Sequence, residues 1–262
     1  MKVILFRADQ TRHKALAHLL NSKGYLIAQV IEQQSENLSP NSSLVTEHFK
    51  AREQFEKDFF SDATSHNFVN VPVITIRSNL INSKDTIKFI SHIDFDIAIT
   101  FGVSILNSET INALNDKILG IHLGLSPYYR GSGTNFFPFV NNELEAVGYT
   151  LMHLDKGTDT GQIVHQGRAP IVLGDSIHTI GNRNIRLLFV DIIKLIESKF
   201  DFSISKSQIL RDSNRYYRKK DFSEQSLITA LENLNNGLVE RYLSDASNMN
   251  SRYPIFRNSL VK

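Results

Sequence analysis

The sequence contains no cysteine. This absence excludes disulfides, thiolate catalysis and cysteine-ligated zinc or iron–sulfur sites. Long apolar runs are absent as well, and the run from Val3 to Phe6 is too short for the core of a signal peptide. Charge of one sign is not in large excess, because 29 Lys and Arg are set against 27 Asp and Glu. We therefore expect a cytoplasmic protein with no membrane partner, and the balanced charge argues against nucleic acid as a partner.

Short continuous apolar segments alternate with amphipathic ones along the first 200 residues. Strands are predicted for the β-branched and aromatic runs at 3–6, 26–31, 71–76, 97–101 and 118–123. Helices are predicted between them, at 12–23, 47–60, 86–93 and 108–114. Strands that are apolar on both faces are typical of a parallel sheet covered on both sides. The predicted fold class is therefore α/β, with a Rossmann-like, mostly parallel twisted sheet that carries helices on both faces.

The character of the sequence changes after residue 200. Before it, two further strands are predicted at 148–154 and 163–170, followed by a long amphipathic helix at 176–198. After it, the segment 211–220 is basic and aromatic, and one helix is predicted at 227–243. We therefore divide the chain into a catalytic core, residues 1–200, and a small C-terminal extension, residues 201–262.

The loops that follow two of these strands carry candidate catalytic residues. In open parallel sheets, ligands bind beyond the carboxyl ends of the strands. His122 ends an apolar strand before a Gly- and Pro-rich loop, where an imidazole can donate a proton to a developing oxyanion near neutral pH. Asp159 lies in a turn close to glycine, and a carboxylate beside an imidazole orients the ring. The two residues form a candidate acid–base pair.

Simpler interpretations of these residues remain open. His122 can be a packed or capping histidine, and Asp159 can stabilise an ordinary Asx turn. The segment 130–133 can be a surface turn, and its two glycines are a weak dinucleotide signal without a third glycine and a later acidic residue. Two other histidines, His13 and His18, lie five positions apart on a predicted helix and are expected at the surface. No metal site is predicted.

The segment 120–131 resembles the signature loop of the folate-dependent formyltransferases. This family includes methionyl-tRNA formyltransferase, glycinamide ribonucleotide formyltransferase and the sugar N-formyltransferases. Its pattern runs Asn-x-His, a small residue, Leu-Pro, two residues and Arg-Gly, and four residues fall at its spacing: His122, Pro127, Arg130 and Gly131. Downstream, the sequence Asp159-Thr160-Gly161 resembles the motif of the family's catalytic aspartate. The resemblance covers residues 1–200, and its specific part is 97–166.

The resemblance implies N-formyl transfer from 10-formyltetrahydrofolate to an amine through a tetrahedral oxyanion. His122 would stabilise the oxyanion, while Asp159 would orient the histidine and help to relay the proton of the amine. Arg130 and Gly131 would contact the substrate. The folate pocket would be lined by two loops that contain Ser104, Ile105, Leu106, Asp155, Lys156, Gly157 and Thr158.

Gly120 departs from the family pattern, which has asparagine at this position. Loss of one oxyanion donor typically costs about 10² to 10³ in rate. Asn135 is the candidate substitute that lies nearby in the sequence. Gly120 therefore keeps a non-catalytic folate- or nucleotide-binding homologue open as an alternative, and a formyl-folate hydrolase is a second one.

The acceptor is expected to be a small amine rather than tRNA, because methionyl-tRNA formyltransferases carry a larger C-terminal domain. A nucleotide-linked amino sugar fits this expectation. The segment 211–220, which includes Tyr216 and Arg218, could contact its phosphates or stack on its base, or it could be a solvated connector.

Overall fold

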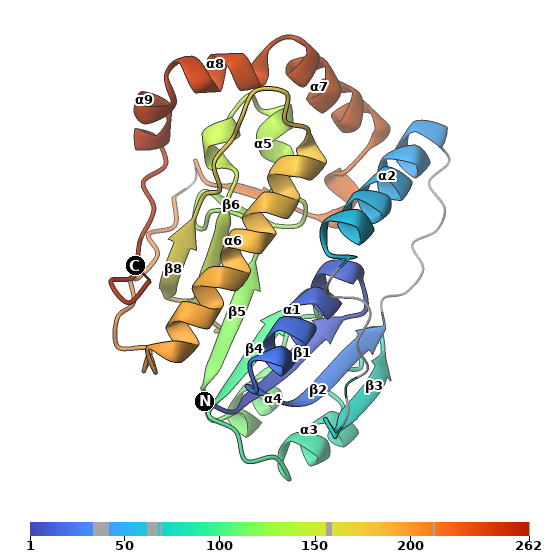
Figure 1. The fold of residues 1–262 in the computed structure, drawn as a ribbon, viewed down its shortest axis with the longest axis vertical. Coiled ribbons are helices and arrows are strands. Elements are labelled where there is room, and N and C mark those ends of the chain that lie inside the picture. Colours follow the sequence, from blue (N-terminus) through green and yellow to red (C-terminus); the bar gives the residue numbers. More distant parts are fainter. Residues whose placement is uncertain (34–41, 62–67, 69, 156–158, 212, 262) are drawn as a thin grey trace.

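The structure, a computed structural model, describes residues 1–33, 42–61, 68, 70–155, 159–211 and 213–261. Within these residues, seven strands form one sheet in the order β3-β2-β1-β4-β5-β7-β8 (Figure 1). Their bounds are β1 Val3–Ala8, β2 Leu26–Gln33, β3 Val73–Arg77, β4 Ile97–Phe101, β5 Ile118–His122, β7 Tyr149–His153 and β8 Ile163–Gly167. The first five pair in parallel, whereas β7 is antiparallel to both of its neighbours. The prediction of a mostly parallel α/β sheet is confirmed.

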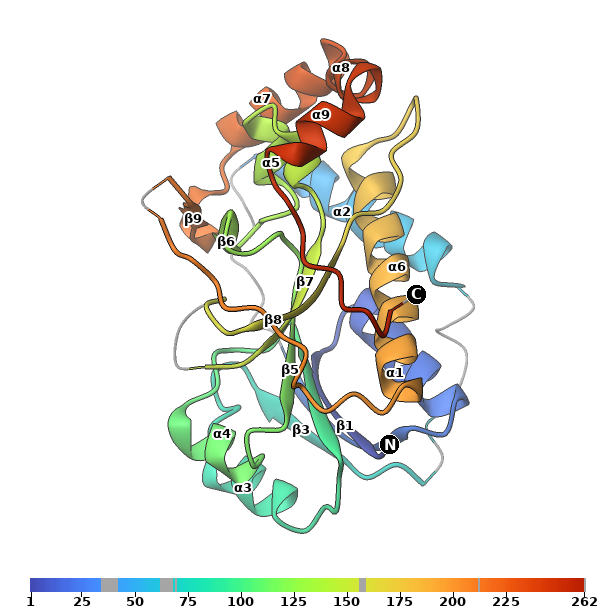
Figure 2. The same ribbon diagram turned by 90° about the vertical axis from the view of Figure 1, so that its left-hand side faces the viewer.

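Helices cover both faces of the sheet (Figure 2). On one face lie α1 (Thr11–Ser22) and α6 (Ile177–Glu197), and on the other lie α3 (Lys84–Ile90) and α4 (Ser108–Ala113). Successive strand residues point to opposite faces. In β4, Ile97 and Ile99 therefore join the apolar cluster under α1 and α6, whereas Ala98 joins the cluster under α3 and α4. This alternation decides which residues of β4 and β5 can share a site.

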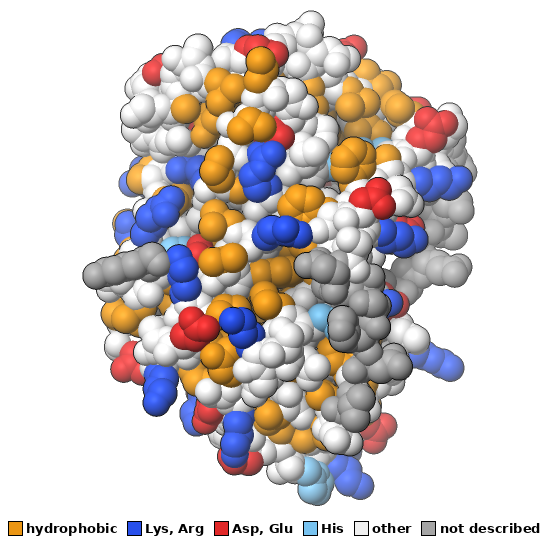
Figure 3. Space-filling model, in the orientation of Figure 1, with side chains coloured by type: hydrophobic (Ala, Val, Ile, Leu, Met, Phe, Trp, Pro, Cys, Tyr) orange, Lys and Arg blue, Asp and Glu red, His pale blue; other side chains and the backbone are white. Residues whose placement is uncertain are grey.

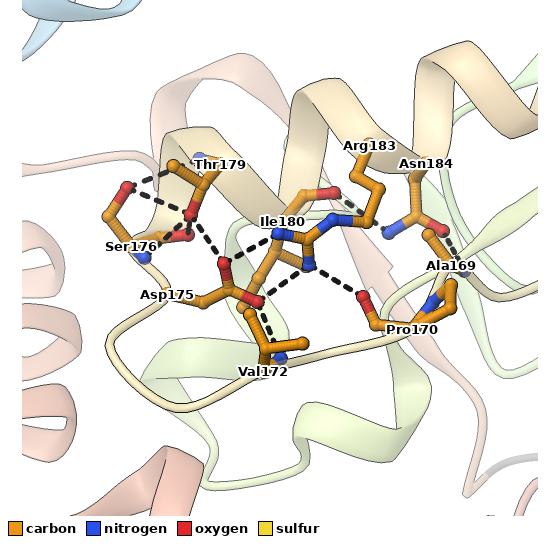
Figure 4. Close-up of polar contacts among 9 residues, drawn as sticks. All are labelled: Ala169, Pro170, Val172, Asp175, Ser176, Thr179, Ile180, Arg183 and Asn184. Atoms are coloured by element: carbon orange, nitrogen blue, oxygen red, sulfur yellow. Dashed lines mark hydrogen bonds and ion pairs between the residues drawn. The ribbon is translucent and has the colours of Figure 1, made fainter.

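The loop from β8 to α6 is fixed by polar contacts at the beginning of α6 (Figure 4). Ser176 caps the helix by accepting from Thr179 N, and the two residues form a capping box. Asp175 accepts two hydrogen bonds from the Arg183 guanidinium, at 2.6 and 2.8 Å, and a third from Val172 N. These bonds join the loop to the second turn of the helix that covers the sheet.

The C-terminal residues pack against the core rather than apart from it. Strand β9 (Arg215–Tyr217) pairs in parallel with β6 (Tyr129–Gly131) in a two-stranded sheet. Helices α7 (Glu224–Asn235), α8 (Leu238–Ser244) and α9 (Ala246–Ser251) lie at the top of Figure 1, where α7 packs on α5 (Phe137–Val140). Helix α2 (Ser43–Phe59) also contacts α7. The division at residue 200 stays a prediction.

The single helix expected at 227–243 is wrong. The chain forms two helices there, and Gly237 separates them with a φ of +79°. Glycine adopts this left-handed conformation at little steric cost, whereas a helix cannot continue through it.

The end of the chain is anchored on β8 through a buried histidine. Asn258 N donates to His165 Nδ1 at 3.1 Å, and His165 Nε2 lies 3.1 Å from Asp191 of α6. The hydroxyl of Tyr149 donates to the same carboxylate. This buried His–Asp contact joins the chain end, the sheet and α6.

The surface expectation for His13 is wrong, because its ring is buried against Phe101 with ring centres 4.4 Å apart. Burial, followed by the charges of Arg12, Arg7 and Arg52, holds the pKa of His13 well below its ordinary value. His18 is partly exposed and stacks on Phe68. On the face of the molecule that Figure 3 shows, acidic and basic side chains are interspersed. Among the described residues, no helix is both long enough and apolar enough to span a membrane.

Candidate active site

His122 and Asp159 lie in contact, although they come from different loops. His122 is the last residue of β5 and is 7% exposed. Asp159 lies in the connection between β7 and β8 and has a φ of +54°, a conformation that aspartate tolerates better than most residues. Its Oδ1 lies 3.3 Å from His122 Nδ1, and its Oδ2 accepts from Gly131 N at 2.8 Å. The carboxylate therefore joins the end of β5 to β6.

The second ring nitrogen of His122 also faces an acceptor. His122 Nε2 lies 3.0 Å from the carbonyl oxygen of Tyr129. A carbonyl oxygen can only accept, so Nε2 carries a hydrogen, and the carboxylate can accept from Nδ1. An imidazolium satisfies both partners at once, and the two contacts fix the plane of the ring. The arrangement can hold a proton and exchange it between imidazole and carboxylate.

A cavity of about 120 Å³ lies beside this pair. It is formed by the end of β4 with the loop that follows, by β5, and by the end of β7 with the loop that follows. Its lining residues are Thr100, Gly102, Val103, Ser104, Ile105, Leu106, Gly120, Ile121, His122, Met152, Leu154, Asp155 and Asp159. Four residues that were expected to bind the folate are among them: Ser104, Ile105, Leu106 and Asp155. The other three, Lys156, Gly157 and Thr158, lie outside the described residues.

Polar side chains behind the cavity hold the loop that follows β4. Glu32, at the end of β2, accepts from Ser104 N at 2.6 Å and from Asn79 N at 2.7 Å. Asn82 donates to the carbonyl of Ile105 and accepts from Asn107 N. Sequence analysis did not single out Glu32, Asn79 or Asn82. A carboxylate that ends an apolar strand is the signal that could have drawn attention to Glu32.

Gly120 lies in the floor of the cavity, against Leu154. A β-carbon at position 120 would overlap the Leu154 side chain, so the space that a side chain would need is already filled. Asn135, the suggested replacement donor, is not among the lining residues, and its side-chain oxygen accepts from Gly148 N at 3.1 Å. The suggestion is wrong, because Asn135 is turned toward the beginning of β7.

Arg130 and Gly131 lie on β6, next to His122 and Asp159, and they make different contacts. Gly131 has a φ of +87°, and a β-carbon there would overlap the carbonyl of Tyr217, so only glycine fits where its N–H reaches Asp159. The guanidinium of Arg130 lies 5.6 Å from the ring centre of Tyr216, and that of Arg218 lies 6.0 Å from it. We call Tyr216, Arg130 and Arg218 the Tyr216 platform. Tyr216 is 47% exposed.

Metal ligation has little support in this part of the fold. Across the described ranges, no three His, Asp or Glu side chains gather closely enough to hold a metal ion. His122 and Asp159 alone are two potential ligands, fewer than a catalytic zinc site requires.

Other proteins of known structure share this fold. A sugar N-formyltransferase from Shewanella matches with a TM-score of 0.55 and 16% identity, over 89% of this chain and 88% of that one. An N-formyltransferase from Helicobacter canadensis, in complex with folinic acid and dTDP-3-aminofucose, matches with a TM-score of 0.52 and 18% identity. That match covers 85% of this chain and 73% of the other. At these identities the likeness concerns the fold.

Comparison of sequences gives the family. The chain is 29% identical over 135 residues to a methionyl-tRNA formyltransferase of Desulforamulus reducens, which is 50% of this chain and 42% of that protein. It thus spans less than half the length of this relative. The family described as formyl transferase matches residues 14–187. Because this match covers more than half of the chain, the protein belongs to the formyl transferase family.

Proposed function

We propose that this protein transfers the formyl group of 10-formyltetrahydrofolate to the amine of a nucleotide-linked amino sugar. The observation that carries the proposal is the contact between His122 and Asp159 beside the cavity. Family membership supports the reaction class. The Helicobacter canadensis protein, with its folinic acid and dTDP-3-aminofucose, supports the two substrate classes. We expect the reaction to take place in the cytoplasm, since a chain without cysteine fits a reducing compartment.

His122 and Asp159 divide the proton transfers of this reaction. A bond forms between the amine nitrogen and the formyl carbon, and the bond from that carbon to the folate nitrogen breaks. Asp159 accepts the proton that the amine loses, directly or through water, and His122 donates one to the departing folate nitrogen. The imidazolium also places positive charge beside the oxyanion that forms at the formyl oxygen. Transfer of the proton from Asp159 to His122 across their 3.3 Å contact restores both groups.

The cavity suits one end of the folate. Its volume of about 120 Å³ is below the range of about 300–1,000 Å³ for pockets that bury a whole ligand. The backbone of the loop at 102–106 is held by Glu32 and Asn82, so its peptide groups are presented in a fixed arrangement. The side chain of Ile105 is 63% exposed at the mouth, where it can cover an apolar part of the ligand.

The Tyr216 platform suits the nucleotide of the acceptor. An exposed aromatic ring can stack on a base, and a guanidinium is well matched to phosphate. Within the described residues, the guanidinium groups of Arg130 and Arg218 form no ion pair with a carboxylate, and Arg130 Nε is buried without a hydrogen bond. Arg130 and Gly131 are adjacent in β6, so the platform is one residue away from the N–H that holds Asp159.

Calorimetry with 5-formyltetrahydrofolate, which is stable to transfer, tests the folate half of the proposal. We expect binding to the wild-type protein and an affinity about tenfold weaker for Ile105→Asp, since a charge at the mouth must be desolvated. Ile209→Asp is the matched control, because Ile209 is 67% exposed and does not line the cavity. No binding to the wild type, or equal losses in the two variants, would contradict the proposal.

Transfer and hydrolysis are separated by supplying the amine or omitting it. Formate release from 10-formyltetrahydrofolate without any amine, at a rate that an amino sugar does not change, would identify a hydrolase. Folate binding without either reaction would identify a non-catalytic homologue.

A further inference from the structure

Thr100 and Gly120 are neighbours across β4 and β5. They are register partners in these parallel strands. Two residues earlier, Ala98 and Ile118 are also partners, and both join the cluster under α3 and α4. Because side chains alternate along a strand, Thr100 and His122 face the same side of the sheet as Ala98 and Ile118. The two polar side chains of these strand ends thus share the cavity's face.

Gly120 lies between Thr100 and His122 on this face and is covered by Leu154, and all four residues line the cavity. Adjacent strands are about 4.8 Å apart, and positions i and i+2 of a strand are about 6.6 Å apart. A hydroxyl on Thr100 and an imidazole on His122 are therefore close enough to contact one small group that lies between them in the cavity. The apolar side chain of Leu154, which packs on Gly120, forms another wall of this cavity.

The hydroxyl of Thr100 has no partner among the described residues. The residue is 6% exposed and lines the cavity, yet its side chain takes part in no hydrogen bond. Other buried threonines of the core differ: Thr150 donates to Gly124 O at 2.7 Å, and Thr110 donates to Asn82 at 2.9 Å. The hydroxyl oxygen of Thr100 is not among the fully buried polar atoms that lack a partner, so it reaches the accessible space of the cavity. Its one donor is available to a ligand in the cavity.

His122 has no ring nitrogen free to donate a hydrogen bond to a ligand in the cavity. Both of its ring nitrogens face acceptors of the protein, the carbonyl of Tyr129 and the carboxylate of Asp159. The ring can supply charge to an oxyanion, but a direct hydrogen bond from it requires one of these contacts to be given up.

We propose that Thr100 is a catalytic residue whose hydroxyl donates a hydrogen bond to the formyl oxygen as this oxygen becomes an oxyanion. The inference rests on the proposed formyl transfer. Thr100 keeps its proton throughout, so the proton transfers of His122 and Asp159 are unchanged. The hydrogen bond strengthens as negative charge develops on the oxygen, so it lowers the barrier more than it favours binding.

Two variants of Thr100 distinguish a role of its hydroxyl from a role of its packing. Thr100→Val removes the hydroxyl at nearly constant volume, whereas Thr100→Ser keeps it and loses the methyl group. The probes are 10-formyltetrahydrofolate with dTDP-3-aminofucose for transfer, 10-formyltetrahydrofolate alone for formate release, and 5-formyltetrahydrofolate for binding. For Thr100→Val we expect kcat to fall about 10²-fold, with KM and the Kd of 5-formyltetrahydrofolate nearly unchanged. Thr100→Ser should keep most of the activity.

Each outcome has a definite meaning. A Thr100→Val variant as fast as the wild type overturns the role of Thr100 and leaves the proposed function intact. A Thr100→Ser variant as slow as Thr100→Val overturns it as well, because the methyl group and not the hydroxyl would then matter. A wild-type protein that catalyses neither transfer nor hydrolysis overturns both proposals.

Discussion

The carboxylate of Asp159 lies 3.3 Å from Nδ1 of His122, and its other oxygen is held by the backbone of Gly131. One side chain thus connects the end of β5, the β7–β8 connection and β6. The imidazole can neither turn nor move away from the cavity without breaking this contact or the one to Tyr129 O. Residues held in this way are expected to act as one unit.

Removal of either member of this unit should abolish most of the activity. For His122→Asn and for Asp159→Asn we expect kcat to fall about 10² to 10⁴-fold. The double variant should be little slower than either single one, because the two groups act in the same proton transfers. Steady-state rates of the four proteins test this, with His92→Asn at an exposed position as control. Independent, multiplicative losses would contradict it.

Substitution of Gly120 should be costly because of Leu154. We expect Gly120→Ala to lower the free energy of unfolding by about 1–3 kcal/mol, since the β-carbon overlaps the Leu154 side chain. Leu154→Ala should remove part of this cost in the double variant, measured as a coupling energy from urea denaturation. Gly181→Ala in α6 is the matched control, because open space surrounds that position, and it should be stabilising by about 0.5–1 kcal/mol. A Gly120→Ala protein as stable as the control would show that Leu154 yields freely.

The Tyr216 platform should determine affinity for the nucleotide without affecting the folate. Loss of base stacking in Tyr216→Ala should weaken dTDP binding about tenfold or more, whereas Tyr216→Phe keeps the ring and should bind like the wild type. Calorimetry with dTDP measures the first effect, and 5-formyltetrahydrofolate should bind all three proteins equally. Equal dTDP affinities for the alanine variant and the wild type would show that the Tyr216 platform does not bind the nucleotide.

Acid should destabilise the contact between α2 and α6. Burial, followed by the charges of His178 and Arg52, lowers the pKa of His48 from 6.5 to about 4. Between pH 6.5 and about 4, the unfolded chain therefore binds more protons than the folded one. The stabilisation from burying neutral His48 is fully present above pH 6.5 and is lost as the pH falls toward 4. In His48→Gln the fall in Tm between these pH values should be shallower than in the wild type. An unchanged slope for His48→Gln would contradict the assignment.

The sheet and the position of His122 are predictable from the sequence for a physical reason, whereas Asp159 is predictable from its motif. Buried parallel strands are continuous apolar runs, so β4 is predicted at 97–101 and is found at Ile97–Phe101. His122 ends such a strand. Asp159 follows β7, which runs antiparallel to β5, so the two strands end on opposite edges of the sheet and the connection after β7 brings Asp159 back to His122. The break at Gly237 could have been read as a stop signal, because glycine in a helical pattern often ends the helix.

The details around the pair depend on register and packing, which the sequence does not display. The pairing of Thr100 with Gly120 follows from how β4 and β5 align, and the position of Leu154 follows from the turn after β7. His13 is polar and lies on an amphipathic helix, yet its ring fills the space below Gly102, where a β-carbon would overlap it. Such close contacts arise between elements, so a pattern within one element cannot predict them.

Mass spectrometry of the acceptor tests the central claim most directly. The protein is incubated with 10-formyltetrahydrofolate and nucleotide-linked amino sugars, dTDP-3-aminofucose among them, beside the Asp159→Asn variant. The account predicts an acceptor that gains one formyl group on its amine with the wild-type protein, at a rate at least about 10²-fold above that of the variant. An acceptor that stays unmodified, or one that is formylated equally fast by both proteins, would contradict it.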